Sequence, residues 1–279
     1  MAEKESLLNS LLGLAMIVEA RDPYTGGHLW RVGQFSKLLA QQAGLSRRDV
    51  ALCEVGGFLH DLGKVGVPDA ILNKPDKLTD AEYAVIKTHP TVGGKLLATH
   101  PLAKLATEAV TGHHERPDGN GYPNALAGEV IPEVARIVGI ADAFDAMTST
   151  RAYRKGMPVA KAFSIIGDEL GSQFDATLGK HFIALSPSSE LAHIVGHSEP
   201  GLPMQTCPAC GGPLALRRKQ HDGEYIYCRA CGGESRLHKI GDSFRLEMTG
   251  QMGDASVLAP DSDPDLIGGM VEELAPHLL

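Results

Sequence analysis

Long apolar runs and a basic N-terminus are both missing from this 279-residue sequence. No stretch of eighteen consecutive apolar residues occurs, which is about the minimum that spans a bilayer as a helix. Residues 1–6 hold two Glu and one Lys, which is too acidic for a secretory signal peptide. We therefore expect a cytoplasmic protein that neither enters nor crosses a membrane. The hydrophobic content of 43% is enough for a sizeable core, and the length indicates a main domain with an appendage.

Basic residues are absent from the last thirty positions. Residues 250–279 carry six acids and no Lys or Arg, which accounts for most of the formal net charge of −8. Residues 201–246 carry seven bases against four acids, and residues 1–186 carry nineteen bases against twenty-one acids. An anionic ligand would therefore be attracted by local groups and not by the overall field. We expect residues 249–279 to form an acidic tail that is partly disordered, with a short helix around residues 266–274.

Cysteine is scarce, with five residues, and four of them stand in two Cys-x-x-Cys knuckles. Seventeen residues separate the first knuckle, Cys207 and Cys210, from the second, Cys228 and Cys231, and each is followed by Gly-Gly. This spacing is typical of a four-thiolate structural zinc ribbon. Two disulfides would need an oxidising compartment, and a redox Cys-x-x-Cys would not need a second copy. The fifth cysteine, Cys53, is interpreted as a small buried hydrophobe.

We place the ribbon at residues 204–248, after a linker at residues 187–203 that is rich in Pro, Ser and Gly. A segment this short has little core of its own, so zinc would supply much of its folding free energy. We therefore expect the ribbon to unfold independently and the rest of the chain to keep its activity without it. Binding of nucleic acid or of a partner stays open, although a solvated face on a small docking module is the preferred interpretation.

Apolar residues in the first 186 positions repeat at helical spacing. The clearest runs are Leu7, Leu8, Leu11, Leu12 and Ala15; Leu29, Val32, Phe35, Leu38 and Leu39; and Val134, Ile137, Val138 and Ala141. Ser46 and Thr79, each followed three residues later by an acid, predict helix starts, and Gly44 predicts a helix end. The sequence thus predicts a mainly α fold, a helical bundle over residues 1–186 followed by a small β ribbon.

Seven residues with metal-binding side chains are spread over this helical part. They are His28, His60, Asp61, His89, His113, His114 and Asp142. Imidazole and carboxylate hold divalent first-row metals, and the adjacent His-Asp and His-His pairs can serve two ions. None of the seven is a cysteine, and the mixture suits Fe, Mn or Zn rather than Ca. Because they come from different predicted helices, the core of the bundle becomes the site.

Six ordered blocks carry a resemblance to a known family. They lie at residues 21–28, 60–69, 71–75, 87–90, 113–123 and 141–155. They include His60-Asp61-Leu62-Gly63-Lys64 and the turn Gly121-Tyr122-Pro123. In order and spacing the blocks resemble the HD-GYP domain, over roughly residues 5–186. The resemblance implies an HD-type helical bundle and a cyclic di-GMP phosphodiesterase that yields linear pGpG, with GMP left open as a further product.

The resemblance also implies a binuclear metal site, with Fe or Mn as the expected ions. Asp61 would bridge the ions; His28, His60 and Asp142 would complete one coordination sphere, and His89, His113 and His114 the other. A hydroxide between the ions would attack phosphorus in line, and Lys64 would neutralise charge on the phosphoryl oxygens. The residues implied in substrate contact are Lys64, Gly121, Tyr122, Pro123, Asp145, Arg151 and Arg154.

Family members with a third ion carry an extra carboxylate one helical turn before the first histidine. Tyr24 stands at that position here. A phenol, which titrates near pH ~10, is a poor ligand for Fe or Mn at neutral pH. Glu19 and Asp22 are out of register with that turn. We therefore expect two ions in the bundle and one structural zinc in the ribbon.

Other functions stay open. The substrate could be another cyclic dinucleotide or nucleotide, because HD phosphohydrolases share this metal core. The chain could instead be a metal-loaded docking module that contacts a signalling protein through the Gly-Tyr-Pro surface or the ribbon. The full set of ligands together with Lys64 argues against that second alternative. A homodimer is left open, and no nucleic-acid partner is expected.

Overall fold

The computed structural model describes residues 2–19, 21, 26–74, 76–150, 155–186, 188–241, 243–258 and 263–279. The N-terminal part is helical. Its α-helices are α1 (Ala2–Glu19), α2 (His28–Gln42), α3 (Arg47–Leu59), α4 (Asp69–Leu72), α5 (Asp80–Ile86), α6 (His89–Leu97), α7 (Thr107–Gly112), α8 (Glu133–Thr148), α9 (Val159–Asp168) and α10 (Ala176–Ala184). Short 3-10 helices are η1 (Leu62–Gly66), η2 (Ala103–Leu105) and η3 (Gly128–Val130).

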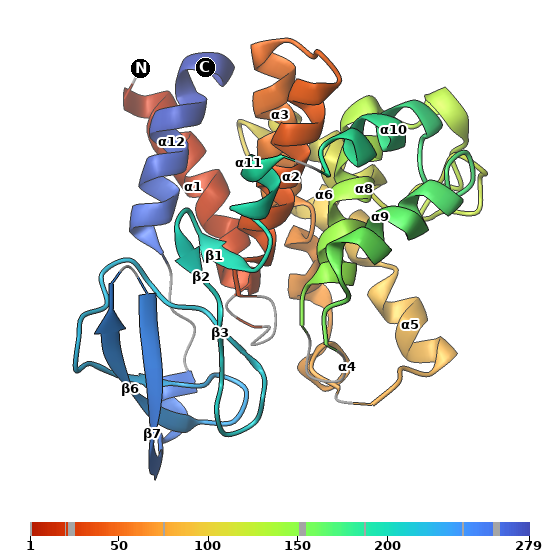
Figure 1. Ribbon diagram of the computed structural model, residues 1–279. Coiled ribbons are helices and arrows are strands. Elements are labelled where there is room, and N and C mark those ends of the chain that lie inside the picture. The colour runs from red at the N-terminus through yellow and green to blue at the C-terminus, as the bar shows by residue number, and fades with distance from the viewer. Residues whose placement is uncertain are drawn as a thin grey trace.

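The C-terminal part contains small antiparallel sheets between helices. It comprises α11 (Ser189–Ala192), β1 (His197–Glu199), β2 (Leu202–Pro203), β3 (Gln205–Thr206), β4 (Pro213–Leu214), β5 (Tyr225–Tyr227), β6 (Gly233–Ile240), β7 (Ser243–Met252), η4 (Ala255–Leu258) and α12 (Pro264–Leu278). Strand β1 pairs with β2, β3 pairs with β4, and β5, β6 and β7 form a three-stranded sheet in that order. Figure 1 shows the helices gathered in one bundle, with β6 and β7 projecting from one end. The predicted mainly α fold with a small C-terminal β part is confirmed.

Helices α2 and α3 pack against each other at the centre of the bundle. Gly44, at φ 77°, follows the end of α2, and Ser46 accepts a hydrogen bond from the backbone of Asp49 at the start of α3. The short turn between them makes the helices antiparallel, so the beginning of α2 lies beside the end of α3. The rings of His28 and His60 are accordingly 5.2 Å apart between centroids.

An aromatic cluster fixes α8 against α2. Phe144 of α8 makes edge-to-face contacts with Phe35 of α2 and Phe182 of α10, with ring centroids 5.1 and 5.0 Å apart. Phe163 of α9 packs on the same side, 5.0 Å from Phe144. Rings in such geometry add roughly 0.5–1.5 kcal/mol per pair beyond the area they bury. The cluster therefore holds the turn of α8 that carries Asp142.

The acidic C-terminal segment contributes to the core. Helix α12 is longer than the short helix expected around residues 266–274, and it lies beside α1, so the two chain ends meet at one end of the molecule (Figure 1). Its buried side chains include Ile267, Met270 and Leu274. Its outer face carries the acids, and Glu273 pairs with Lys37 of α2. The segment is amphipathic, and its apolar face completes the bundle where a partly disordered tail with a short helix was expected.

The predicted linker also has defined structure. Residues 188–203 contain α11 and the β1–β2 pair, and Leu191 and Ile194 are buried in the core of the bundle. Strand β7 continues past residue 248, where the ribbon was expected to end. Among the residues that the structure describes, no helix is long and apolar enough to span a bilayer.

Candidate metal centre

The seven side chains predicted as bundle ligands meet in its core. His28 begins α2, His60 and Asp61 follow α3, His89 begins α6, His113 and His114 follow α7, and Asp142 lies in α8. They form two triads in which the ligand atoms lie within 4.8 Å of one another, one of His28, His60 and Asp142, the other of His89, His113 and His114.

Asp61 lies between the two triads. Its Oδ2 is 3.5 Å from His28 Nε2 and 3.4 Å from His60 Nε2, whereas its Oδ1 is 3.5 Å from His89 Nε2. One carboxylate oxygen therefore faces each triad, as in a carboxylate that bridges two ions. His89 reaches this place because α6 approaches η1 at Gly63, where a Cβ would lie 1.8 Å from the His89 carbonyl oxygen. Only glycine permits that approach.

Four of the histidines have their Nδ1 engaged away from the centre. Nδ1 of His60 lies 2.6 Å from the Gly57 carbonyl, Nδ1 of His89 lies 2.8 Å from the Ile86 carbonyl, and Nδ1 of His113 lies 3.0 Å from the Ala109 carbonyl. Nδ1 of His28 lies 2.8 Å from Asp145 Oδ2. Because a carbonyl or carboxylate oxygen can only accept, each Nδ1 donates. In the neutral ring this leaves the Nε2 lone pair facing the centre, the state that binds metal.

The donor set fits a cation. His89 Nε2 and His113 Nε2 are 3.1 Å apart, and both carry lone pairs in the neutral rings, which repel unless a positive charge lies against them. Buried His60 Nε2 makes no well-aligned hydrogen bond in the described part of the chain, although the carboxylates of Asp61 and Asp142 lie 3.4 and 3.7 Å away. Burial lowers the pKa of His89 and of His113, and lowers the pKa of His114 to about 4. These three rings are therefore neutral and available as ligands at neutral pH.

The other triad is built for positive charge. Burial alone would lower the pKa of His60, but the carboxylates of Asp61 and Asp142 outweigh burial and raise that pKa to about 10. Burial would raise the pKa of Asp61, but Lys64 and His60 hold it well below its usual range. The ionised carboxylates thus favour a cation at this position.

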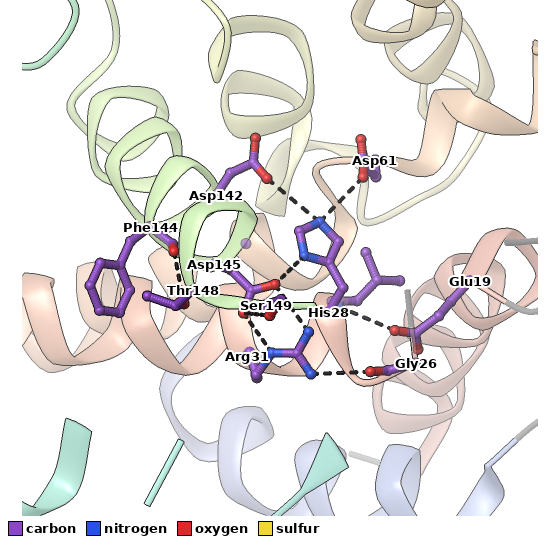
Figure 2. A network of polar contacts seen from close by, with 12 residues as sticks. Glu19, Gly26, His28, Arg31, Asp61, Asp142, Phe144, Asp145, Thr148 and Ser149 are labelled. Carbon is purple, nitrogen blue, oxygen red and sulfur yellow. Dashed lines mark hydrogen bonds and ion pairs between the residues drawn. The ribbon is translucent and has the colours of Figure 1, made fainter. Parts of the chain in front are cut away.

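Asp145 differs from its predicted role. It was expected to contact substrate, but it is 1% exposed and lies behind His28 (Figure 2). Its Oδ2 accepts from His28 Nδ1, and Arg31 donates to both oxygens, from Nε at 2.5 Å and from Nη2 at 3.0 Å. Burial would raise the pKa of Asp145, but Arg31 and His28 lower it below its usual range. A charged carboxylate in this place orients His28 and makes the ring a stronger donor.

Lys64 lies beside the bridge. Its Nζ donates to Asp61 Oδ2 at 2.6 Å. The position is compatible with a role in neutralising charge near the ions. Of the other predicted site residues, Arg151 and Arg154 lie outside the described residues, as does Tyr24.

A cavity of about 530 Å³ opens beside the triads. His113, His114 and Asp142 reach it, as do Gly121 and Tyr122 of the predicted substrate set. Pro123 and Asp145 are not among its lining residues. The ring of Tyr122 stacks on His114 with centroids 4.6 Å apart, so the Gly-Tyr-Pro turn covers one face of a candidate ligand.

The cavity has further polar residues that sequence reasoning did not single out. Arg116 pairs with Asp118, and Arg136 pairs with Asp175, each at 2.6 Å. Lys87 lies over the rings of Tyr83 and Tyr122, 5.3 and 5.8 Å from their centroids, and has no carboxylate partner among the described residues. Lys87 stands two residues before His89 in one of the six ordered blocks, and this place could have pointed to it as a site residue.

The four predicted zinc ligands form a separate cluster. Cys207 Sγ lies 3.8 Å from Cys231 Sγ, and Cys210 Sγ lies 3.7 Å from Cys228 Sγ. Four sulfurs at ~2.3 Å from a central ion at tetrahedral angles stand roughly 3.8 Å apart. The cluster therefore has the dimensions of a structural zinc site.

Known proteins are similar to this chain over its helical part. A family model described as HD domain matches residues 13–178. The chain is similar to Cyclic di-GMP phosphodiesterase response regulator RpfG of Xanthomonas campestris pv. campestris, 41% identical over 60% of this chain and 44% of that protein. It is also similar to a Cyclic di-GMP phosphodiesterase of Vibrio cholerae, 37% identical over 63% of this chain and 39% of that protein. The 3'3'-cGAMP-specific phosphodiesterase 3 of Vibrio cholerae is 38% identical over 57% of this chain and 35% of its own length. The chain spans less than half the length of each of these relatives.

Proposed function

This chain belongs to the HD domain family, and on that premise we propose that it is a metal-dependent phosphodiesterase that hydrolyses cyclic di-GMP to linear pGpG. The names of two relatives support this substrate. The name of a third relative supports the wider class of cyclic dinucleotides, so 3'3'-cGAMP is the second candidate substrate.

The observation that carries the proposal is the position of Asp61. Its two carboxylate oxygens face different triads of neutral or carboxylate-paired ligands. A binding module would need no such pair of ligand sets next to a cavity of about 530 Å³. Two Fe or Mn ions fit these imidazole and carboxylate ligands, and when bound they would activate a water molecule and polarise the phosphoryl oxygens.

The chain's own residues would bind and orient the substrate. Asp61 keeps the two triads in register, and Lys64 balances its charge. Lys87, on the rim, is suited to a phosphate oxygen, because no described carboxylate competes for it. Tyr122 offers an aromatic surface to a purine base beside His114.

The test is an assay of the full chain, purified anaerobically and loaded with Fe or Mn. Turnover is measured on cyclic di-GMP, 3'3'-cGAMP and cyclic di-AMP, with products separated by chromatography. We expect cyclic di-GMP to give pGpG at the highest kcat/KM, and Asp61→Ala to retain less than a tenth of the wild-type rate. Loss of a ligand or its support typically costs about tenfold to a hundredfold, and a bridge serves two ions.

The matched control is Asp168→Ala, which removes an exposed carboxylate of α9 away from the cavity. It should hydrolyse substrate at the wild-type rate. Circular dichroism should show the same helix content in both variants. If the unmodified enzyme hydrolysed only 3'3'-cGAMP, that dinucleotide would be its substrate and not cyclic di-GMP. If it hydrolysed none of the three cyclic dinucleotides, the proposed function would be wrong.

A further inference from the structure

The appended C-terminal part is docked directly behind His28. The turn that precedes His28 contains Gly27, at φ 73°, where a Cβ would lie 2.5 Å from Ser198 Cα. At Gly26 a Cβ would lie 2.9 Å from the Cβ of Ala215. Strand β1 and the segment after β4 therefore pack on the turn that starts α2, and glycine is needed for both contacts.

Arg31 connects the two parts. It is 2% exposed, and while Nε and Nη2 hold Asp145, its Nη1 donates to the carbonyl of His197 at 2.9 Å and to that of Gly26 at 3.1 Å. Figure 2 shows Arg31 between Asp145 and Gly26, with the ring of His28 on the far side of Asp145. A continuous set of bonds thus runs from strand β1 through Arg31 and Asp145 to a candidate metal ligand.

Strand β1 is in turn tied to the cysteine cluster. Ser198 Oγ donates to the carbonyl of buried Leu216 at 3.3 Å. The Sδ of Met204 lies 3.1 Å from Arg31 Nη1, and only β3 separates Met204 from Cys207. The core of the ribbon is small. Its buried members among the described residues are Cys207, Leu214, Leu216, Ile226, Cys228 and Leu237. So few apolar side chains leave the metal as the main support of its fold.

We propose that metal bound at the four cysteines strengthens ion binding in the bundle, because the folded ribbon holds Arg31, Arg31 holds Asp145, and Asp145 holds His28. Arg31 is a positioning residue in this arrangement, and the ribbon is a support for the catalytic metal site. The role in turnover rests on the proposed function, but the effect on ion binding does not. In place of a bundle whose activity survives loss of the ribbon unaided, we expect the ribbon to support ion binding in the bundle.

The test measures Mn²⁺ affinity in the full chain by electron paramagnetic resonance, without substrate. Cys210→Ser should lose one zinc and weaken one of the two bundle ions about tenfold to a hundredfold, the usual cost of losing a partner behind a metal-binding histidine. Arg31→Lys cannot donate to both oxygens of Asp145 and to the His197 carbonyl at once, so it should lower the affinity for the same ion while the ribbon stays folded. Combining the two should add little, since both interrupt one set of bonds.

The control is Lys239→Ala, an exposed change on β6 that should alter neither zinc content nor Mn²⁺ affinity. Unchanged Mn²⁺ affinity in zinc-free Cys210→Ser would overturn the proposal, and so would fully additive effects of the two changes. Compared with the unmodified protein, Cys210→Ser should show a larger increase in hydrogen exchange at residues 26–31 than in α9 and α10. Uniform loss of protection over the bundle would also overturn it, because the ribbon would then be a general stabiliser.

Discussion

At the scale of the residue, the way each ligand side chain is oriented decides whether it can hold an ion. His28, His60, His89 and His113 are useful as ligands because each Nδ1 is already donating to an oxygen on its outer side. The carboxylate of Asp61 is useful because its two oxygens point to different triads. These histidines and Asp61 stand at or directly after helix ends, and the position of each helix end sets the direction of its side chain.

Lys87 provides a test of substrate binding at this scale. Lys87→Met should raise KM roughly tenfold with a smaller effect on kcat, because a charge-assisted contact to phosphate contributes about 1.5–3 kcal/mol and this lysine is exposed. The matched control is Lys95→Met, an exposed change on α6 outside the cavity, which should leave KM unchanged. Steady-state kinetics decide, and equal KM values for the two variants would exclude Lys87 from the phosphate site.

The ligand residues could be predicted from the sequence, because histidines and aspartates in such blocks have few other uses. The pairs His60-Asp61 and His113-His114, together with the place of His28, His89 and Asp142 in the ordered blocks, predicted all six members of the two triads and Asp61 between them. The role of Asp145 was not accessible, because three residues after Asp142 a carboxylate can face either the cavity or the next helix. Packing of α8 against α2 turns it toward Arg31.

At the scale of the element, helix ends were predicted better than the relations between helices. The capping box of Thr79 and Glu82 starts α5, and Ser46 starts α3, because these bonds are local in the chain. The packing of α12 was missed. Its apolar positions were hidden among acids and glycines, and its partners on α1 and α3 are more than two hundred residues away in the sequence.

Leu274→Ala tests whether α12 is part of the core. Leu274 is 1% exposed, so we expect the change to lower the free energy of unfolding of the bundle by ~2–5 kcal/mol. Urea unfolding followed by circular dichroism measures this. Glu272→Ala, an exposed neighbour, serves as the control and should change stability by less than about 0.5 kcal/mol. Equal stability of the two variants would mean that α12 does not contribute to the core.

At the scale of the whole molecule, the junction between bundle and ribbon contains a buried acid. Burial and the neighbouring Asp263 carboxylate raise the pKa of Glu199 to about 7, against the effect of Arg217 and Arg218. Glu199 is 2% exposed, and its Oε1 has no hydrogen-bond partner in the part of the chain that the structure describes. Below pH 7 the folded protein therefore holds this carboxyl protonated.

The pH dependence of stability follows from that pKa. Because the folded pKa lies above the unfolded one, the stabilisation is complete below the unfolded pKa and is lost as the pH rises through about 7. The contribution of Glu199 to the free energy of unfolding should fall from pH 5 to pH 8 by at most about 3 kcal/mol, which lowers the melting temperature. Glu199→Gln should remove this contribution, so its stability should fall less between pH 5 and pH 8 than that of the exposed control Glu190→Gln. The same slope in both variants would rule out Glu199 as its source.

We expect the bundle to hold two ions, one on either side of Asp61. Anomalous scattering from a crystal of the Mn-loaded full chain, recorded at the Mn edge, locates such ions directly. We predict two peaks, one bounded by His28, His60 and Asp142 and the other by His89, His113 and His114, with Asp61 between them. A single peak, a third well-occupied peak in the bundle, or no peak beside Asp61 would contradict the claim.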